Sequence, residues 1–390
     1  MAQVDQDRLI ITANYGRGNL RVAMSNRIYL NTLNLDGFDG GGTPGGGTPG
    51  GGGGNAPGKP DIPVMGDGKT YLYIKIAAPG RMDVPLYFSQ TVANGVTIDW
   101  GDGSAPQTLS GTGKVNTTHK YAEIGEYTIS LDPAEGCALN LGNASSSNCV
   151  LGSTGSSNSV YRNMLQAVEI GNRRTNCSSY AFCMCSSLVS IVIPEGVTSM
   201  GLNTFQNCSS LASIVIPGSV LGVGQAQFYG CTSLTSVVIS DGVSTIANQA
   251  FDGCLSLKCV VIPESVTNIN YMAFHKCSSL ASIIIPGSVT SIGGRMFQDC
   301  SSLASIIIPG SVTSIGDYAF GSCTGIAFYD FSKHTAVPTL SSQFAFSGIL
   351  SDCKIIVPDA LYDEWIAATN WSIFASNIIK KTDWDASQTA

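Results

Sequence analysis

Apolar and polar residues recur in one fixed pattern through the second half of the chain, with a period of 23 residues. Leucine, phenylalanine and cysteine each keep this period, so three separate registers coincide. The three series are Leu165, Leu188, Leu211, Leu234, Leu257, Leu280 and Leu303; Phe182, Phe205, Phe228, Phe251, Phe274, Phe297 and Phe320; and Cys185, Cys208, Cys231, Cys254, Cys277, Cys300 and Cys323. A period of this length predicts a solenoid, in which each unit buries its apolar face only against its neighbours.

The shared unit is close to L-x-S-I-x-I-P-x-S-V-T-x-I-G-x-x-A-F-x-x-C-x-S. Its β-branched part, at residues 190–193 and again at 282–285, predicts one short strand per repeat. The strand is expected to end at the proline that follows, because proline has no backbone N–H to donate to a neighbouring strand. Side chains alternate along a strand, so we expect Ile191 and Ile193 in the core. Gly201 and its equivalents predict a turn, and the A-F-x-x-C-x-S part predicts about one helical or 3₁₀ turn.

This repeat resembles the BspA-like leucine-rich repeats of bacterial surface proteins and of phage or prophage structural proteins from gut bacteria. The resemblance covers roughly residues 165–323. The segment I-I-V-P-D-A-L-Y-D-E-W-I-A-A-T-N-W, at residues 355–371, resembles the C-terminal cap of such proteins from Bacteroides-type bacteria and their phages. The resemblance implies a scaffold for recognition or spacing and brings no catalytic residues.

The cysteine series has three interpretations. The simplest is a column of small, buried, apolar side chains. Disulfides between neighbouring coils fit the spacing, although thirteen cysteines is an odd number and a continuous column offers no natural pairing. A metal site is disfavoured because no C-x-x-C pair occurs, and the one local cluster is Cys177, Cys183 and Cys185. We therefore expect no metal and no cofactor.

The N-terminal part predicts an anchor followed by a tether. Residues 1–38 contain alternating segments at 8–12 and 31–35, which predict two or three short strands or an extended arm, but the segment is too short to bury its own core. We expect it to fold against a partner, with a disordered tail as the alternative. Residues 39–68 are rich in Gly and Pro and predict a flexible linker.

Residues 69–133 predict a small β-sandwich, because alternating segments recur at 71–76, 96–99 and 125–131. The sequence W-G-D-G-S, followed by H-x-Y-x-x-x-G-x-Y-T-I, resembles a PKD-type domain, which is an immunoglobulin-like sandwich. Asp99, Asp102 and His119 are candidate calcium or metal ligands there. We favour a structural interpretation, with a turn at Asp102, a packed Trp100 and a strand at His119.

The rest of the chain completes the solenoid. Residues 134–159 are rich in Ser, Asn and Gly and predict a connector, in which Leu139 and Leu141 begin a cap. The leucine-rich-repeat solenoid takes residues 160–327. Residues 328–390 predict a last repeat and a helical cap, with a helix near residues 359–369. The predicted fold is mainly β, with a small PKD-like or immunoglobulin-like sandwich before a capped solenoid.

Composition narrows the range of partners. Charged residues make up only 12% of the chain and the net charge is -7, which argues against a nucleic acid or an anionic membrane as partner, since each requires a clustered basic face. No apolar run approaches the eighteen or so residues of a membrane span. The first residues show neither the basic region nor the apolar run of a Sec signal, so we expect none in this stretch.

Catalytic chemistry has little support in the sequence. Three scattered histidines and the absence of nucleophile-elbow, H-E-x-x-H or Walker sequences lead us to expect no catalytic residues and no enzyme. One feature predicts a partner, an aliphatic row at the outward strand position where a polar residue is usual. The row contains Val192, Val215, Val238, Val261, Ile284 and Ile307. The alternative is that Val and Ile serve strand propensity alone.

These expectations combine into one hypothesis about function. The chain is expected to be a non-catalytic fibre or appendage of a virion or phage-tail-like particle, attached to other particle proteins through residues 1–38. Its repeats would recognise a glycan or protein of the host surface, and we expect a homo-oligomer. The alternative is a secreted bacterial cell-surface adhesin whose signal peptide is missing here.

Overall fold

The computed structural model describes residues 4–5, 8–15, 18–23, 66–142, 148–153 and 159–389. The chain divides into two units, Met1–Pro63 and Val64–Ala390. In the first unit, β1 (Val4–Asp5), β2 (Arg8–Tyr15) and β3 (Gly18–Ala23) form an antiparallel sheet. The strand predicted at residues 8–12 is therefore confirmed. The strand predicted at 31–35 and most of the predicted linker lie outside the described residues.

Two antiparallel sheets enclose a core at the start of the second unit. Their strands are β4 (Thr70–Ile76), β5 (Asp83–Gln90), β6 (Val96–Asp99), β7 (Gln107–Thr108), β8 (Gly113–Lys120) and β9 (Gly125–Pro133), with the 3₁₀ turn η2 (Pro79–Arg81) after β4. The strands predicted at 71–76, 96–99 and 125–131 are confirmed. Strand β5 carries Pro85 and is absent from the prediction. Strand β8 pairs with the whole of β5, but β10 on the other edge pairs only with its last three residues, so one edge of β5 lacks a paired strand at Pro85 and tolerates a proline.

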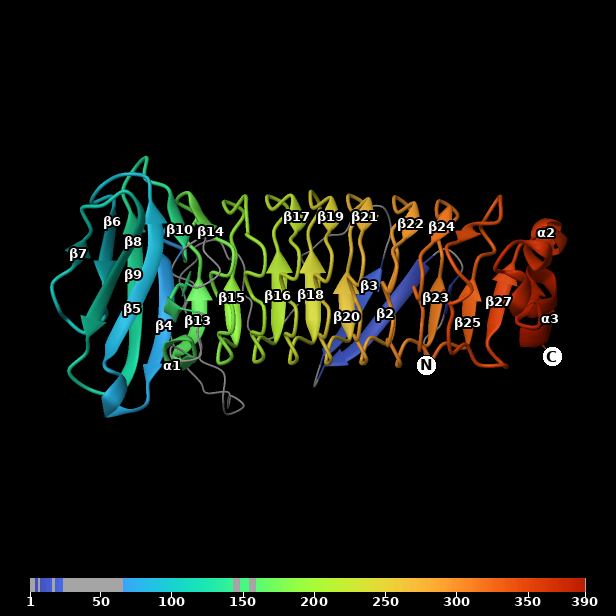
Figure 1. The fold of residues 1–390 in the computed structure, drawn as a ribbon, viewed down its shortest axis with the longest axis horizontal. Coiled ribbons are helices and arrows are strands. Elements are labelled where there is room, and N and C mark those ends of the chain that lie inside the picture. Colours follow the sequence, from blue (N-terminus) through green and yellow to red (C-terminus); the bar gives the residue numbers. More distant parts are fainter. Residues whose placement is uncertain are drawn as a thin grey trace. The chain divides into compact units, whose positions relative to one another are not determined.

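Both sheets continue into the solenoid (Figure 1). In one sheet, β13 (Leu165–Glu169) pairs antiparallel with β4 and parallel with β15 (Ser190–Val192). In the other, β10 (Leu139–Leu141) pairs with β5 on one side and with β14 (Thr175–Cys177) on the other. Along the chain, β10 and β13 are separated by β11 (Asn148–Cys149), β12 (Gly152–Ser153) and the short helix α1 (Ser159–Arg162). One hydrophobic core runs through both parts, so the sandwich covers the N-terminal edge of the solenoid.

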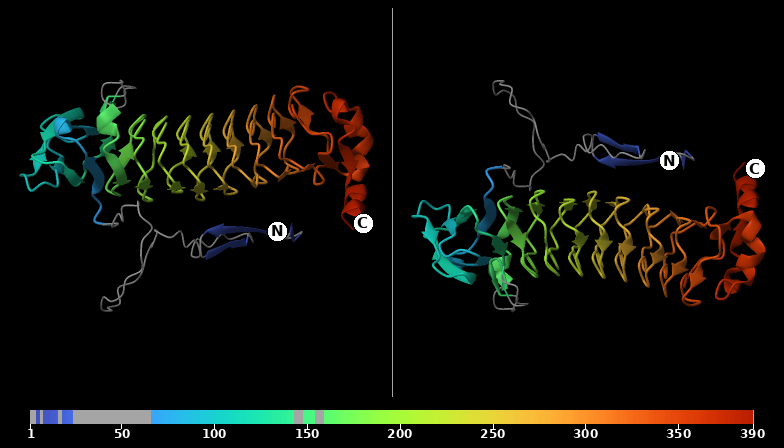
Figure 2. Two further views of the ribbon diagram at one scale, coloured as in Figure 1. Left: turned by 90° about the horizontal axis from the view of Figure 1, so that it is seen from below. Right: turned by 90° about the horizontal axis from the view of Figure 1, so that it is seen from above.

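The repeats stack as coils along one axis (Figure 2). After β15, the first set of strands contains β16 (Ser213–Ile216), β18 (Ser236–Ile239), β20 (Cys259–Val261) and β23 (Ser305–Ile307). The structure adds a second set of two-residue strands, β17 (Gly222–Val223), β19 (Thr245–Ile246), β21 (Asn268–Ile269), β22 (Ser291–Ile292), β24 (Ser314–Ile315) and β26 (Thr339–Leu340). The strand predicted at 282–285 is wrong, because no ladder is assigned there, although Ile283 and Ile285 stay buried.

The core of the coils follows the three registers of the sequence. Ile191 and Ile193 are buried as predicted. The seven phenylalanine rings are buried and stack nearly parallel, with centroids 5.3 to 5.8 Å apart. The A-F-x-x-C part forms hydrogen-bonded turns. No turn is assigned at Gly201; a Cβ atom there would clash with the backbone nitrogen of Ser179, so glycine permits the close approach of two coils.

The C-terminal end is closed by a helical cap. It contains β25 (Phe328–Asp330), β27 (Lys354–Val357), η4 (Asp359–Leu361), α2 (Tyr362–Ala367), η5 (Ser372–Phe374), β28 (Ile378–Lys380) and α3 (Lys381–Thr389). The helix predicted near 359–369 is confirmed as η4 and α2. Trp365, Trp371 and Phe374 are buried beneath the cap, whereas β28 and α3 are absent from the prediction.

Candidate binding surface

The outward side chains of the first strand set form the row expected from the sequence, which we call the aliphatic stripe. Strands β16, β18 and β20 are in register, so Val215, Val238 and Val261 are direct neighbours. Val192 pairs with Glu169 at one end, and Ile307 pairs with Asp330 at the other. Ile284 holds the same position in the coil that has no assigned strand. Stacked strands lie about 4.8 Å apart, so the stripe is about 24 Å long.

The stripe is unevenly open to solvent. Val238 keeps 8% of its surface exposed and Ile307 keeps 50%, while the other four residues are half-buried. The adjacent outward row is small and polar, and consists of Ser190, Ser213, Ser236, Cys259, Ser282 and Ser305. The apolar part of this face is therefore a narrow band that widens towards Ile307.

The chain covers both ends of this face with its own segments. At the N-terminal end, the backbone nitrogen of Gly66 donates to Glu169 Oε1 at 3.2 Å. At the C-terminal end, Trp384 of α3 packs against Phe328, which follows Ser305 in the polar row, with ring centroids 5.2 Å apart. Between these two covers, five of the six stripe residues keep part of their surface exposed, whereas Val238 is buried.

Two charges flank the stripe within one coil. Lys258 immediately precedes β20 and Glu264 follows it by three residues, and both are exposed. Neither makes an ion pair within the part of the chain that the structure describes. By contrast, Glu195 of an earlier coil accepts a hydrogen bond from the Ser219 nitrogen at 3.2 Å. The prediction from the sequence missed Lys258 and Glu264, although a comparison of equivalent positions finds them.

The equivalent positions in the other coils of the stripe carry no base and two acids. The positions that match Lys258 are Val189, Ala212, Thr235, Ala281 and Ala304. The positions that match Glu264 are Glu195, Gly218, Asp241, Gly287 and Gly310. One edge of the face therefore carries a single base, and the opposite edge carries three acids.

The cysteine column is a packing feature. Six of its thiols donate to the phenylalanine carbonyl of the preceding coil at 2.9 to 3.3 Å, as Cys231 does to Phe205. All thirteen cysteines are free, and all except Cys259 are buried. Burial raises the pKa of Cys231 to about 12, so its thiol stays protonated at neutral pH. The interpretation as buried apolar side chains is confirmed, and the described residues contain no group of three potential metal ligands.

The sandwich residues singled out in the sequence make local contacts. His119 Nε2 lies 2.7 Å from Asp102 Oδ2, and the His119 ring stacks on Trp100 with centroids 4.7 Å apart. Hydrogen bonds from Ser104 and His119 lower the pKa of Asp102 to about 2. Asp99 accepts a hydrogen bond from the Gly101 nitrogen at 2.9 Å. The buried Trp100 and the position of His119 on β8 are as predicted.

A second histidine lies within the solenoid. His275 Nδ1 is 2.8 Å from Asp252 Oδ1, and its Nε2 is 3.5 Å from Asp299 Oδ2. His275 and Asp252 are buried. The two carboxylates contact different nitrogens of one ring, so they lie on opposite sides of the imidazole and cannot chelate one ion with it. This group joins three successive coils.

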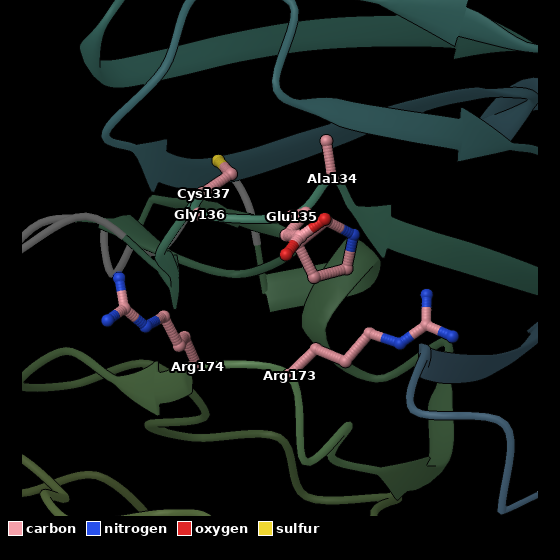
Figure 3. A pocket seen from close by; sticks show the side chains of 7 residues that line it. Ala134, Glu135, Gly136, Cys137, Arg173 and Arg174 are labelled. Carbon is pink, nitrogen blue, oxygen red and sulfur yellow. The ribbon is translucent and has the colours of Figure 1, made fainter.

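A cavity of about 280 Å³ lies where the loop after β9 meets the first coil (Figure 3). Glu135 and Cys137 line it from the loop, and Arg173 and Arg174 line it from the coil. Figure 3 shows the two arginine side chains pointing away from each other, and Arg173 binds Asp132 with a nitrogen–oxygen distance of 3.0 Å. Their guanidinium groups therefore do not converge on one ligand position.

Comparison with known families identifies the repeats. The family model for the BspA type leucine rich repeat region matches residues 152–234 and 222–348 in six copies, which together span about half of the chain. The chain belongs to this family. Membership confirms the fold implied by the resemblance of the 23-residue unit. It does not extend to residues 69–133, whose likeness to a PKD domain stays a prediction.

Leucine-rich repeat proteins of known structure show limited similarity to this chain. A leucine rich cell surface protein from Faecalibacterium prausnitzii is 22% identical, and the match covers 57% of this chain and 82% of that chain with a TM-score of 0.35. A leucine-rich repeat protein from Bacteroides ovatus is 21% identical, with coverages of 55% and 66% and a TM-score of 0.35. No curated protein matches the chain. Among the described residues, no helix combines the length and apolar character needed to cross a membrane.

Proposed function

We propose that this BspA type protein is a non-catalytic appendage of a virion or phage-tail-like particle. Residues 1–38 attach it to other particle proteins, and the repeats present a surface that recognises a glycan or protein of the host. The observation that carries the proposal is the aliphatic stripe, a contiguous row suited to contact with protein on a chain with few charges. Membership of the BspA type family supports the coarser part of this proposal, a surface or adhesion-type role.

The order of parts along the chain supports the same assignment. The Gly-rich residues 39–68 act as the tether, and many tethered copies on one scaffold gain avidity without any new contact. The PKD-like sandwich acts as a spacer, because its sheets are continuous with the solenoid and hold the two parts as one body. A host ligand bound by the solenoid is then linked to the particle through residues 39–68.

Family membership is equally compatible with a secreted bacterial cell-surface adhesin. Mass spectrometry of purified particles from the source culture, alongside fractionated cell envelopes, separates the two functions. The appendage predicts this chain in particles, with Met1 or Ala2 as its mature start. Recovery only from envelopes, after processing at an upstream signal, would replace the appendage with the adhesin.

A further inference from the structure

The open part of the stripe has dimensions that suit a modest protein interface. Six coils give a length of about 24 Å, and the six residue-to-residue steps from Lys258 to Glu264 give a width of about 20 Å. The face therefore offers about 500 Å² per partner, or about 1,000 Å² in total, which is at the low end for specific complexes. A partner that fits must be flat, apolar along its middle and bounded at both ends, because the chain's own segments limit the face at Glu169 and Phe328.

A second copy of the same face has these properties, and its charges select one orientation. Two stripes can lie against each other with a two-fold axis either along the solenoid or along the strands. An axis along the strands places the acidic edge of one copy on the acidic edge of the other. Glu264 of one copy would then lie against the partner's edge that carries Glu195, Asp241 and Glu264. An axis along the solenoid places the acidic edge on the opposite edge of the partner, coil against coil.

We propose that the protein forms a parallel dimer through the aliphatic stripe, in which Lys258 of each copy pairs with Glu264 of the other. Both residues belong to one coil and lie at its two edges, so the axis along the solenoid creates the ion pair twice. Asp241 lies one coil away on the same edge and adds to the negative potential that Lys258 meets. This inference rests on the proposed role of the stripe as a protein contact, and does not depend on attachment to a particle.

Charge reversal tests the pairing in the full chain. We expect the mass in solution, measured by sedimentation equilibrium at rising concentration, to increase from 40.6 kDa towards twice that value. Lys258→Glu and Glu264→Lys should each weaken the dimer at least tenfold in dissociation constant. The double variant K258E/E264K restores an opposite pair at both sites and should recover most of the loss.

Two matched variants separate the ion pair from a general effect of charge. Glu195→Lys reverses an acid on the same edge as Glu264, but in the parallel dimer this residue faces the uncharged Val189 of the second copy. Lys276→Glu reverses an exposed base on a turn outside this face. Each variant should keep a dissociation constant within about threefold of that of the parent protein, as expected for a change of an isolated surface charge. In a mixture of unlabelled and isotope-labelled chains, a carbodiimide should link Lys258 to Glu264 between copies.

Several results would overturn the dimer. A mass that stays at 40.6 kDa at several hundred micromolar, on the order of the weakest specific interfaces, would do so. A tighter dimer in Glu264→Lys would indicate a two-fold axis along the strands, because the substitution would remove repulsion between the acidic edges of the two copies. Failure of the double variant to recover binding would remove the Lys258–Glu264 pair. A monomer that is nevertheless recovered from purified particles would refute the dimer and leave the proposed appendage intact.

Discussion

The phenylalanine stack offers the sharpest test of how the solenoid is held together. Phe251 is fully buried and lies between Phe228 and Phe274, with ring centroids 5.3 and 5.4 Å away. Phe251→Ala removes a core ring that its neighbours, fixed by adjacent coils, cannot replace, so a cavity remains. Such substitutions cost about 3 to 5 kcal/mol, and each stacked pair contributes about 0.5 to 1.5 kcal/mol beyond burial. We therefore expect a loss of about 4 kcal/mol.

The measurement is equilibrium unfolding in urea followed by far-UV circular dichroism. With a slope of about 3 kcal/mol per molar, the midpoint should fall by roughly 1.3 M. Phe344→Ala is the matched control, because Phe344 also stacks on a ring, that of Tyr318 at 5.2 Å, but is 43% exposed. Its cost should be about 1 kcal/mol.

Hydrogen exchange adds a spatial readout, because each coil contacts only its neighbours. Exchange in Phe251→Ala should accelerate in the coils of Phe228 and Phe274 more than in strand β5 of the sandwich. Equal costs for the Phe251 and Phe344 variants, or a cost for Phe251 below about 2 kcal/mol, would refute the role given to the stack.

Three further predictions concern polar and sulfur groups. The lowered pKa of Asp102, about 2 against an ordinary 3.8, contributes stability that is fully present above pH 4 and is lost as the pH falls towards 2. Because Asp102 is exposed to solvent, this contribution should be no more than about 1 kcal/mol, and acid titration of Asp102→Asn should lack it. His275→Ala should lower the free energy of unfolding, measured by thermal unfolding, by about 1 to 3 kcal/mol, because it leaves buried Asp252 without its closest partner. His275→Gln should lower it less, because a glutamine, Gln298, occupies the equivalent position in the next coil. With a thiol reagent, Cys259 should react first in the native protein and the buried cysteines only after unfolding; rapid labelling of several thiols without denaturant would contradict their burial.

Local pattern was enough to predict the coils. The 23-residue register of Phe251 and Cys254 fixes which side chains stack, and alternation fixes that Ile191 faces inward while Val192 faces outward. The candidate stripe follows from the same alternation, so its position on one face could be read directly. Its exposure could not, because Val238 and Ile307 have the same place in the repeat and differ only in what their neighbours cover.

Long-range pairing was beyond the sequence. Nothing in the residues of β4 indicates that it pairs with β13, about ninety residues later, because either strand edge offers the same backbone groups. Pro85 conceals β5 for a similar reason, since proline is acceptable only where one edge of the strand is unpaired, and the sequence does not show that β10 stops short of Pro85. The sequence did not predict that α3 covers Phe328. Helix α3 has no buried residue and only a weak apolar pattern, and its contact with Phe328 is made by the single aromatic residue Trp384.

Strand β4 also determines how the molecule carries mechanical load. The chain enters the second unit just before Thr70, and β4 lies between β13 and β9 with backbone hydrogen bonds along both of its edges. A pull applied through the preceding segment acts along the strand, so these bonds are loaded together in shear and do not open one after another. Because β13 belongs to the solenoid and β9 to the sandwich, the force spreads into both parts at once.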